Sequence, residues 1–470
     1  MSYPFPTDRH FSNSVVSVKG GESLTRGSLI LPAYLLFWVL HIPLGIWAAS
    51  SPQLATLHAL GTLVVGIWFA VTRAPLERVI YVTVYIVGAE VFWRATGANV
   101  FWEYGKYAMV LLIMLASLRL RPLRISRCLL TYFVFLLPAV VPTLLQLPIE
   151  PAREQISFNL SGHVVFFTAA VFFSNFTISK EVLKNSLTIL IAPAIALATV
   201  ALHSLLSSEI TWSRSSNFMA SGGFGPNQVS TALSSGALAA LLLLWLFDSS
   251  AIKRFLLVGL VLWFTVHGLL TFSRGGIVIL VGSVGVVVLS LLLVPGQARR
   301  FRLSITLMFF SLALLLWLYP QLNDLTAGNL ALRFSDTDLT GRDKIAQASW
   351  RVFLEHPLTG VGIGLAPDYI APLYGRRAAA HTEFARLLAE HGLMGVLSLI
   401  LFAWAYLHKL RQTLKLPFLR HVSLAWATWS VGYMLGNAMR TAAPSFFLAF
   451  TFVGLVSEAD SQEDLSHQGT

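Results

Sequence analysis

Long apolar runs separated by short polar segments repeat along most of the chain. Each run approaches the ~20 residues that an α-helix needs to cross a lipid bilayer. The pattern predicts about fourteen membrane-spanning helices, or about twelve to thirteen if the short third, fourth and last runs do not all cross. The predicted spans are residues 29–49, 53–72, 79–93, 105–118, 128–147, 162–178, 186–206, 229–247, 255–272, 276–294, 303–320, 391–408, 421–438 and 444–457.

One polar segment, residues 321–390, is too long to be a simple connection between two spans. It divides the chain into an N-terminal tail (1–28), a first group of spans (29–320), the segment itself, a second group of spans (391–457) and a C-terminal tail (458–470). The C-terminal tail is acidic and polar, which is typical of disorder. The predicted fold class is therefore all-α, a polytopic integral membrane protein whose one large loop contains short helices.

The composition excludes a soluble globular protein. Of the 470 residues, 56% are hydrophobic and only 12% are charged, whereas soluble domains are typically ~25% charged. The net charge of +11 would suit a nucleic acid, but basic residues in a membrane protein mark cytoplasmic loops, and we expect no nucleic-acid partner. Cys128 is the only cysteine, so an internal disulfide and a cysteine-based zinc site are excluded. The polar start of the chain does not resemble a cleavable signal peptide.

Basic residues favour one orientation of the spans. With the N-terminus inside, both termini are cytoplasmic and residues 321–390 face the outer side. Arg214, Asn227, Arg274 and Arg440 then lie on that same outer side. The basic residues of the predicted cytoplasmic segments are Arg9, Lys19, Arg26, Arg73, Arg78, Arg119, Arg121, Arg124, Arg127, Lys180, Lys184, Lys253, Arg254, Arg299, Arg300, Arg302, Lys409, Arg411, Lys415 and Arg420.

Two arginines on the outer side are candidate anion-binding residues. Arg274 lies between two apolar runs, in Ser273-Arg274-Gly275-Gly276, where an arginine is costly unless it is functional or paired. A tight turn with a snorkelling arginine is the alternative. Arg342 precedes a predicted helix, Asp343 to Glu355. A helix N-terminus and a guanidinium together favour an anion, although many helix starts carry an arginine on a solvated face.

The end of the polar segment carries the candidate base. His381 begins a predicted helix that runs to Glu390, beside Glu383. Its ordinary pKa suits proton abstraction near neutral pH, although a lone loop histidine usually has no special role. His391 is expected to tolerate change better. Upstream, the glycine-rich stretch at residues 360–364 follows a helix and is predicted to be a flexible turn, because it lacks the context of a nucleotide-binding fingerprint.

Two further outer loops have both a structural and a functional interpretation. The loop near residues 207–227 is either a polar connection with Asn227 as a helix cap or a lip that binds phosphate or sugar through Arg214. The loop at residues 93–104 combines Arg94 with tryptophan and tyrosine, which are usually membrane anchors, although aromatic rings also stack on sugars.

An ordered series of these motifs resembles the O-antigen ligase and O-antigen polymerase superfamily of bacterial surface-polysaccharide enzymes. The similarity covers roughly residues 205–395, and the preceding residues are similar only as a set of spans. The family usually has His-Asn where this chain has His381-Thr382, which weakens any role for the second position. The motifs are, in order, Gly225-Pro226-Asn227, Ser273-Arg274-Gly275-Gly276, Gly341-Arg342, residues 356–362 and residues 381–395.

The resemblance implies a GT-C-like architecture and a glycosyltransferase of the bacterial inner membrane. It implies a donor glycan on undecaprenyl diphosphate, an acceptor such as lipid A-core or another glycan, and neither cofactor nor metal. In that interpretation His381 is the general base of an inverting transfer, and Arg274, Arg342 and Arg214 bind the diphosphate. Asn227 and Glu383 would line the glycan or acceptor site.

Three alternatives remain open at the level of sequence. A polymerase of the same superfamily would use another lipid-linked repeat as acceptor, and a protein-glycosylating transferase would use a protein. A polysaccharide or lipid transporter would place polar residues near the midplane of the membrane, whereas the predicted spans are poor in charge apart from Glu90 and Lys106.

Overall fold

The all-α prediction is confirmed by the structure, a computed structural model in which 78% of the described residues are helical. The structure describes residues 30–72, 74–247, 249–293, 298–336, 338 and 341–455. Within these residues the only strands are β1 (Thr177–Ile178) and β2 (Gly454–Leu455), which pair in parallel. The predicted tails, 1–28 and 458–470, lie outside the described residues.

The helices follow the predicted apolar runs closely, and every predicted span overlaps a helix or a short series of helices. Nine helical stretches within the described ranges are long and apolar enough to cross a membrane. The helices are α1 (Ile30–Ser50), α2 (Pro52–Val71), α3 (Leu76–Ala95), α4 (Tyr104–Ser117), α5 (Arg127–Val134), η1 (Leu137–Ala139), α6 (Val140–Gln146), α7 (Ile149–Ser174), α8 (Lys180–Ser207), η2 (Met219–Ser221), α9 (Pro226–Leu246), α10 (Ala251–Leu270), α11 (Arg274–Leu292), α12 (Ala298–Leu325), α13 (Asn329–Ser335), α14 (Arg342–Glu355), α15 (Ala366–Tyr374), α16 (Glu383–Thr413), α17 (Pro417–Asn437) and α18 (Ala442–Phe450).

The last predicted span is shorter in the structure than in the sequence analysis. Residues 444–457 were expected to cross the membrane, but α18 has nine residues. At ~1.5 Å per residue such a helix covers less than half of the ~30 Å hydrocarbon core. The chain between α17 and α18 therefore turns back inside the bundle, and this connector (residues 438–441) is an important part of the candidate site.

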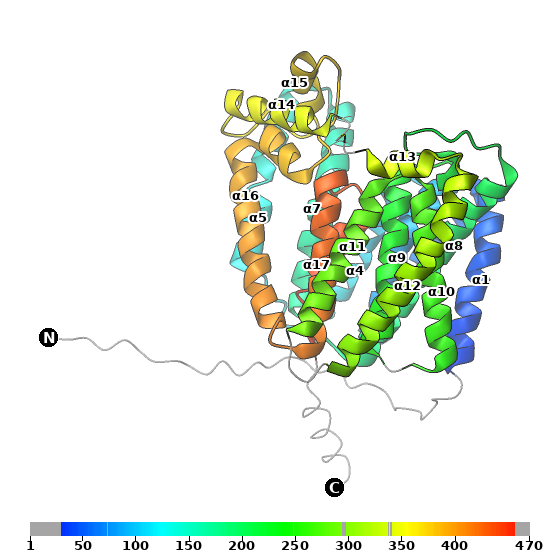
Figure 1. Ribbon diagram of the computed structural model, residues 1–470. Coiled ribbons are helices and arrows are strands. Elements are labelled where there is room, and N and C mark those ends of the chain that lie inside the picture. The colour runs from blue at the N-terminus through cyan, green and yellow to red at the C-terminus, as the bar shows by residue number, and fades with distance from the viewer. Residues whose placement is uncertain are drawn as a thin grey trace, which may run out of the picture.

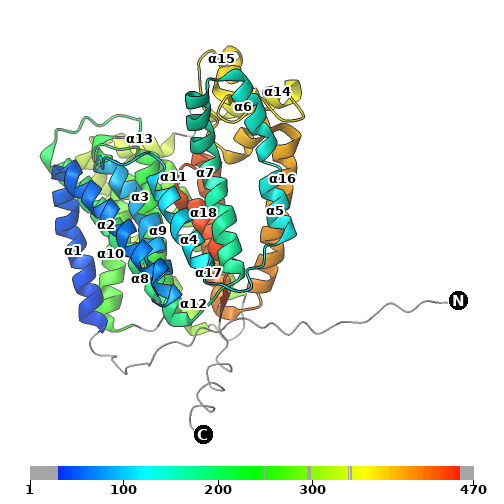
Figure 2. The ribbon, with the colours of Figure 1, turned by 180° about the vertical axis from the view of Figure 1, so that it is seen from behind.

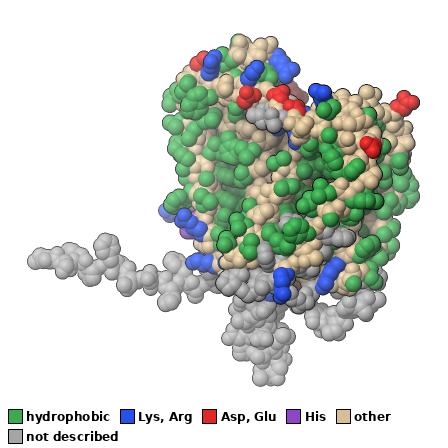
Figure 3. Space-filling view, viewed as in Figure 1, with side chains coloured by type: hydrophobic (Ala, Val, Ile, Leu, Met, Phe, Trp, Pro, Cys, Tyr) green, Lys and Arg blue, Asp and Glu red, His purple; other side chains and the backbone are tan. Residues whose placement is uncertain are grey.

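The polar segment forms a cap at one end of the helical bundle. Helices α13, α14 and α15 lie at that end, and the first and last described residues lie at the opposite end (Figures 1 and 2). In the space-filling view charged side chains gather toward the two ends, and the surface between them is mainly hydrophobic (Figure 3). This distribution is expected of a protein whose middle is surrounded by lipid.

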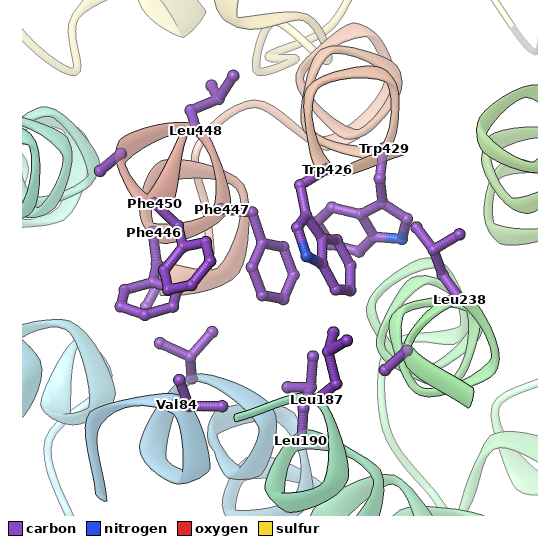
Figure 4. Close-up of a cluster of buried hydrophobic side chains, with 14 of the residues drawn as sticks. Val84, Leu187, Leu190, Leu238, Trp426, Trp429, Phe446, Phe447, Leu448 and Phe450 are labelled. Carbon is purple, nitrogen blue, oxygen red and sulfur yellow. The ribbon is translucent and has the colours of Figure 1, made fainter. Parts of the chain in front are cut away.

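An aromatic cluster fixes α17 and α18 against the bundle. Trp426 of α17 stacks on Phe447 of α18, with ring centroids 4.0 Å apart, and α3, α8 and α9 contribute aliphatic side chains to the same cluster (Figure 4). Trp429 also donates a hydrogen bond to Ser234 of α9 at 2.9 Å. One face of α17 is thereby buried in the protein, and the opposite face remains available to line a cavity.

The cap is joined to the bundle by a close approach of two glycines. Helix α16 breaks at Gly392, where φ is +57°, and there the backbone N–H of Leu393 donates to the carbonyl of Pro357. A Cβ on Gly360 would lie 2.3 Å from the carbonyl carbon of Glu390, so only glycine fits. The glycine-rich stretch is indeed a turn, but it is buried and closely packed instead of the flexible turn that the sequence predicted.

Candidate active site

Arg274 and Arg342, predicted separately from the sequence, line the same cavity. This cavity has a volume of about 750 Å³ and lies between α11 and α17. Arg274 is the first residue of α11, and Arg342 is the first residue of α14. The predicted Asp343–Glu355 helix is thus confirmed, with its N-terminus at the cavity.

Local packing explains the two glycines after Arg274. A Cβ on Gly276 would lie 2.2 Å from the hydroxyl oxygen of Ser230 and 2.5 Å from its backbone, so this glycine lets α11 approach α9. A Cβ on Gly275 would meet only the Ser273 hydroxyl, at 3.9 Å, and Gly275 lines the cavity. Gly275 therefore leaves room for a ligand to come close to the backbone, and Gly276 serves helix packing.

Arg274 also connects the membrane helices to the cap. Its guanidinium donates hydrogen bonds to the backbone carbonyls of Asp336 and Asp338, the second at 2.6 Å. Both terminal nitrogens of the Arg274 guanidinium thus donate hydrogen bonds to the segment that follows α13. Through these bonds Arg274 holds part of the cap over the cavity while its charge remains at the cavity wall.

Arg342 has no such internal partner among the residues that the structure describes. Gly341 before it has φ +76°, and a Cβ there would lie 2.3 Å from the hydroxyl of Tyr374, so the helix start requires glycine. The Nη1 atom of Arg342 lies 3.7 Å from the Cβ position of Gly436, at the end of α17. Burial lowers the pKa of Arg342, and the charges of Arg274 and Arg333 lower it further. A cavity with three adjacent cations attracts an anion.

Arg333 is the residue that the sequence analysis missed. It lies on α13, lines the cavity, and donates from Nε to the carbonyl of Phe272 at 3.0 Å. Its carboxylate neighbour Asp336 is 3.9 Å away. The sequence carried a signal, since Arg333 is one of the basic residues of the outer segment, but nothing in the pattern distinguished it from the exposed ones.

The rest of this cavity is apolar and open to the membrane side of the bundle. Val278, Val431 and Leu435 line it and are among the large hydrophobic side chains exposed at the protein surface. Small residues form much of the remaining wall between α11 and α17: Gly275, Gly282, Ala427, Gly432 and Gly436. The cavity therefore has a cationic end near the cap and an apolar groove that lipid can enter.

Asn227 and Arg214 have different positions relative to this cavity. Asn227 lines it, and its side-chain oxygen accepts a hydrogen bond from the Ser273 hydroxyl at 2.6 Å. It does not cap α9, whose N-cap residue is Gly225. Arg214 is exposed in the loop before α9 and is not among the residues that line the cavity. The structure thus brings Asn227 to the two arginines and leaves Arg214 apart from them.

His381 lies close to the cationic end, in the stretch just before α16. Burial and the charges of Arg342 and Arg440 lower its pKa to about 4. His381 does not itself line either cavity described here, but Ala380 before it lines a second, smaller one of about 100 Å³ together with Arg440. His381 is consequently near Arg342 of the first cavity and Arg440 of the second, and its ring is neutral at pH 7.

The start of α16 corrects the predicted helix boundary. The helix begins at Glu383 and not at His381, and the hydroxyl of Thr382 accepts a hydrogen bond from the backbone N–H of Ala385 at 3.0 Å. Thr382 is the N-cap, a role that asparagine fills equally well. The family's His-Asn pair is replaced here by His381-Thr382, but the residue after His381 still serves as the helix N-cap.

Glu383, which the resemblance placed at the glycan or acceptor site, is buried, and its carboxylate is engaged by other groups of the protein. Its carboxylate accepts hydrogen bonds from His163 at 2.7 Å, from Arg386 and from the backbone N–H of Met439 at 2.9 Å. Arg386 also pairs with Glu390 at 2.9 Å. Although Glu383 borders the second cavity, its oxygens hold the protein together and are not free for a sugar hydroxyl.

These buried charges lie outside the predicted span 391–408, in the part of α16 that precedes the break at Gly392. Arg386 pairs with both carboxylates, Glu383 and Glu390. Buried charges in membrane proteins are usually paired in this way.

The fold and the site define a polytopic α-helical membrane protein whose candidate chemistry lies at one end of the bundle, under a cap of short helices. Residues 259–400 match a family model described as O-Antigen ligase. This match supports the resemblance of the motifs to the O-antigen ligase superfamily. The matched stretch includes Arg274, Arg342 and His381, and it ends before α17. A search of curated proteins found no match.

The family gives the activity in general terms. It supports glycan transfer of the ligase or polymerase kind, with a lipid-linked glycan and a glycan acceptor, by a multi-pass membrane protein.

Proposed function

We propose that this protein transfers a glycan from undecaprenyl diphosphate to an acceptor sugar at the periplasmic face of the bacterial inner membrane. The observation that carries the proposal is the amphipathic cavity between α11 and α17. Its cationic end, formed by Arg274, Arg333 and Arg342, suits a diphosphate. Its apolar groove, open to lipid, suits a polyprenyl chain.

The reaction needs a base for the acceptor and an anion site for the leaving group. A ring nitrogen of His381 takes the proton of the acceptor hydroxyl. The hydroxyl oxygen forms a bond to the anomeric carbon of the donor, on the face opposite the diphosphate. The bond from that carbon to the phosphate oxygen breaks, and its electron pair leaves with the undecaprenyl diphosphate. The anomeric configuration is therefore inverted.

The arginines stabilise the charge that develops on the diphosphate as this bond breaks. Such fixed charges in a water-poor site are typically the largest contribution to catalysis. Arg342 also affects the base: burial lowers the pKa of His381, and the charges of Arg342 and Arg440 lower it further in the absence of donor. Bound diphosphate would offset the charge of Arg342 and raise the pKa of His381, so that the histidine becomes a stronger base when the donor is present.

The proposal is tested with purified protein in lipid vesicles, a synthetic undecaprenyl diphosphate-linked oligosaccharide as donor and a glycolipid acceptor. We expect transfer to the acceptor and release of undecaprenyl diphosphate. Growth of the donor glycan without added acceptor would instead indicate a polymerase. Glycan transfer would be refuted if no product formed either with the glycolipid acceptor or with the donor glycan alone.

A further inference from the structure

The connector between α17 and α18 carries an arginine whose role the reaction above does not explain. This connector, residues 438–441, begins at Ala438, a non-glycine residue with φ +52°. Irregular backbone at membrane depth is tolerated only where protein surrounds it or where it lines a cavity. Arg440 lies in this connector, outside the residues that match the family model.

Two buried ion pairs hold the connector on both sides of Arg440. On one side the carboxylate of Glu383 accepts from the backbone N–H of Met439 at 2.9 Å. On the other, Glu90 of α3 accepts from the backbone N–H of Ala442 at 2.6 Å. Each carboxylate is itself paired, Glu383 with Arg386 and Glu90 with Arg94.

The backbone of Arg440 is held as well. Its carbonyl accepts a hydrogen bond at 3.2 Å from Nη1 of Arg94, whose guanidinium also stacks on Trp102 at 4.6 Å. The position of the Arg440 backbone is therefore fixed by groups from α3 and α16, two helices far apart in the sequence.

The side chain of Arg440 differs from the arginines around it. Arg94 and Arg386 each contact a carboxylate. Within the described residues the guanidinium of Arg440 has neither an ion pair nor a hydrogen bond, although the residue is only partly exposed. A partly buried cation without a partner is unfavourable for folding. Because the backbone of Arg440 is held in place, its guanidinium indicates that a ligand supplies the missing partner.

The surroundings of Arg440 indicate what kind of ligand. It borders the smaller cavity together with Gln155 and Asn159 of α7. The Asn159 amide donates to Gln155, which leaves the Asn159 oxygen and the Gln155 amide nitrogen for other partners. Amide groups of this kind suit sugar hydroxyls, and a guanidinium suits a phosphate or carboxylate.

We propose that Arg440, Gln155 and Asn159 form an acceptor subsite for a sugar that carries an anionic group. This inference rests on the proposed function. The connector separates the two cavities, because Asn437 lines the larger one and Ala438 to Arg440 line the smaller one. His381 is close enough to both for the charges of Arg342, on the donor side, and of Arg440, on the acceptor side, to act on its ring.

The test measures binding of acceptor and donor separately, with the full chain in lipid nanodiscs. The acceptor probes are a disaccharide that bears one phosphomonoester and the same disaccharide after phosphatase treatment. The donor probe is undecaprenyl diphosphate. The variants are Arg440→Gln, Arg440→Lys and, as a matched control, Arg351→Gln, which changes an exposed arginine on the outer face of α14.

We expect the unchanged protein to prefer the phosphorylated disaccharide. Arg440→Gln should weaken its binding roughly 10- to 100-fold, as expected for a lost charge-assisted contact, and should leave binding of the dephosphorylated form and of undecaprenyl diphosphate nearly unchanged. Arg440→Lys should retain part of the preference, and unchanged binding of undecaprenyl diphosphate by both Arg440 variants would show that they fold. Arg351→Gln should have no effect.

Two results would overturn the inference. The first is equal affinity of the unchanged protein for the two disaccharides. The second is weaker donor binding with unchanged acceptor binding in Arg440→Gln, which would place Arg440 on the diphosphate. Absence of transfer with the disaccharide preference intact would refute the proposed function and would still support the anion site.

Discussion

The carboxylate of Glu383 accepts a hydrogen bond at 2.9 Å from the backbone N–H of Met439, and this contact joins the start of α16 to the connector between α17 and α18. His381 lies just before α16, and Arg440 follows Met439. The candidate base and Arg440 are therefore positioned by the same buried carboxylate. Glu383 is a positioning residue, a role that the resemblance, which implied a place at the glycan or acceptor site, did not indicate.

Replacing Glu383 should destabilise the protein and impair transfer. Glu383→Ala leaves the Met439 N–H without its acceptor and removes one of the two carboxylates that pair with Arg386. Removing one partner of a buried ion pair typically costs ~3–5 kcal/mol of stability. We expect a clear fall in the Tm of the purified protein in detergent, together with reduced transfer.

The chain offers a matched control for this change. Glu150 and Arg153 form an ion pair with the same spacing as Glu383 and Arg386, but its side chains are 72% and 67% exposed. Glu150→Ala should leave Tm and transfer nearly unchanged, because water screens exposed pairs. Equal effects of the two substitutions would show that Glu383 has no special place in the structure.

Arg274→Ala and Arg342→Ala should each abolish most transfer while the protein still inserts in the membrane. Losing one fixed contact to a developing charge raises the barrier by ~2.7–4 kcal/mol, or about 10²- to 10³-fold in kcat. Lysine should restore little at either position, because an ammonium does not reproduce the two-pronged contact. Transfer rates of the four variants measure this, with Arg351→Lys as the control at an exposed position.

The two arginines should differ in a second measurement. Arg274 holds the backbone of Asp336 and Asp338, so Arg274→Lys should increase hydrogen exchange in that stretch of the cap. Arg342 makes no such bond to the described residues, and Arg342→Lys should leave exchange there unchanged. Near-normal transfer by both lysine variants would reject a bidentate clamp.

The sequence predicts the spans and the convergence of Arg274, Arg342 and His381, for a physical reason. Apolar length fixes where the helices are, and basic residues fix which loops share a face. Together they place distant residues on the same side of the membrane. That conclusion does not depend on knowing which side chains are in contact.

The partners of individual side chains could not be predicted in this way. The contacts of Glu383 with His163 and of Glu90 with the backbone of Ala442 span 220 and 352 residues. They depend on how each helix is rotated and which helices are neighbours. Neither hydropathy nor charge bias contains that information. The sequence therefore did not distinguish Arg333 from other basic residues, and it placed Arg440 on the outer side without indicating its contacts.

The predicted orientation can be tested with single cysteines on a Cys128→Ala background. Ala327 and Ala379 are exposed residues of the outer segment, and cysteines at both positions should react with an impermeant thiol reagent once it reaches the periplasm. Ala251 is exposed at the start of α10, at the opposite end, and a cysteine there should react only after the inner membrane is opened. The reverse pattern would contradict the periplasmic placement of the site.

A chelator should not affect transfer. In the proposed reaction the charge of the diphosphate is balanced by Arg274, Arg333 and Arg342, so no divalent ion is required. Transfer is measured with and without a chelator in the same vesicle preparation. Loss of activity that returns on addition of Mg²⁺ would show that the clamp depends on a metal ion.

Transfer should depend on pH through His381, and the dependence should change when the donor binds. His381→Ala should remove activity and leave donor binding intact, because the histidine acts on the acceptor. Only the neutral ring accepts a proton, so activity is present above the pKa of His381 and is lost below it. In the free protein that pKa is about 4, and the acid limb of kcat/KM should lie well below pH 6.5.

The acid limb of kcat reports the donor-bound protein and should lie at higher pH, because the diphosphate offsets the arginine charges next to the ring. Arg342→Gln should move the acid limb of kcat/KM to higher pH, since one of the charges that lower the pKa of His381 is then gone.

His203→Ala, at an exposed position of α8, is the control. His391 is unsuitable, because it is fully buried and its replacement should destabilise the fold, contrary to the tolerance expected from sequence. Full activity of His381→Ala would remove the general-base role, and acid limbs that coincide in kcat and kcat/KM would contradict the coupling between donor charge and base.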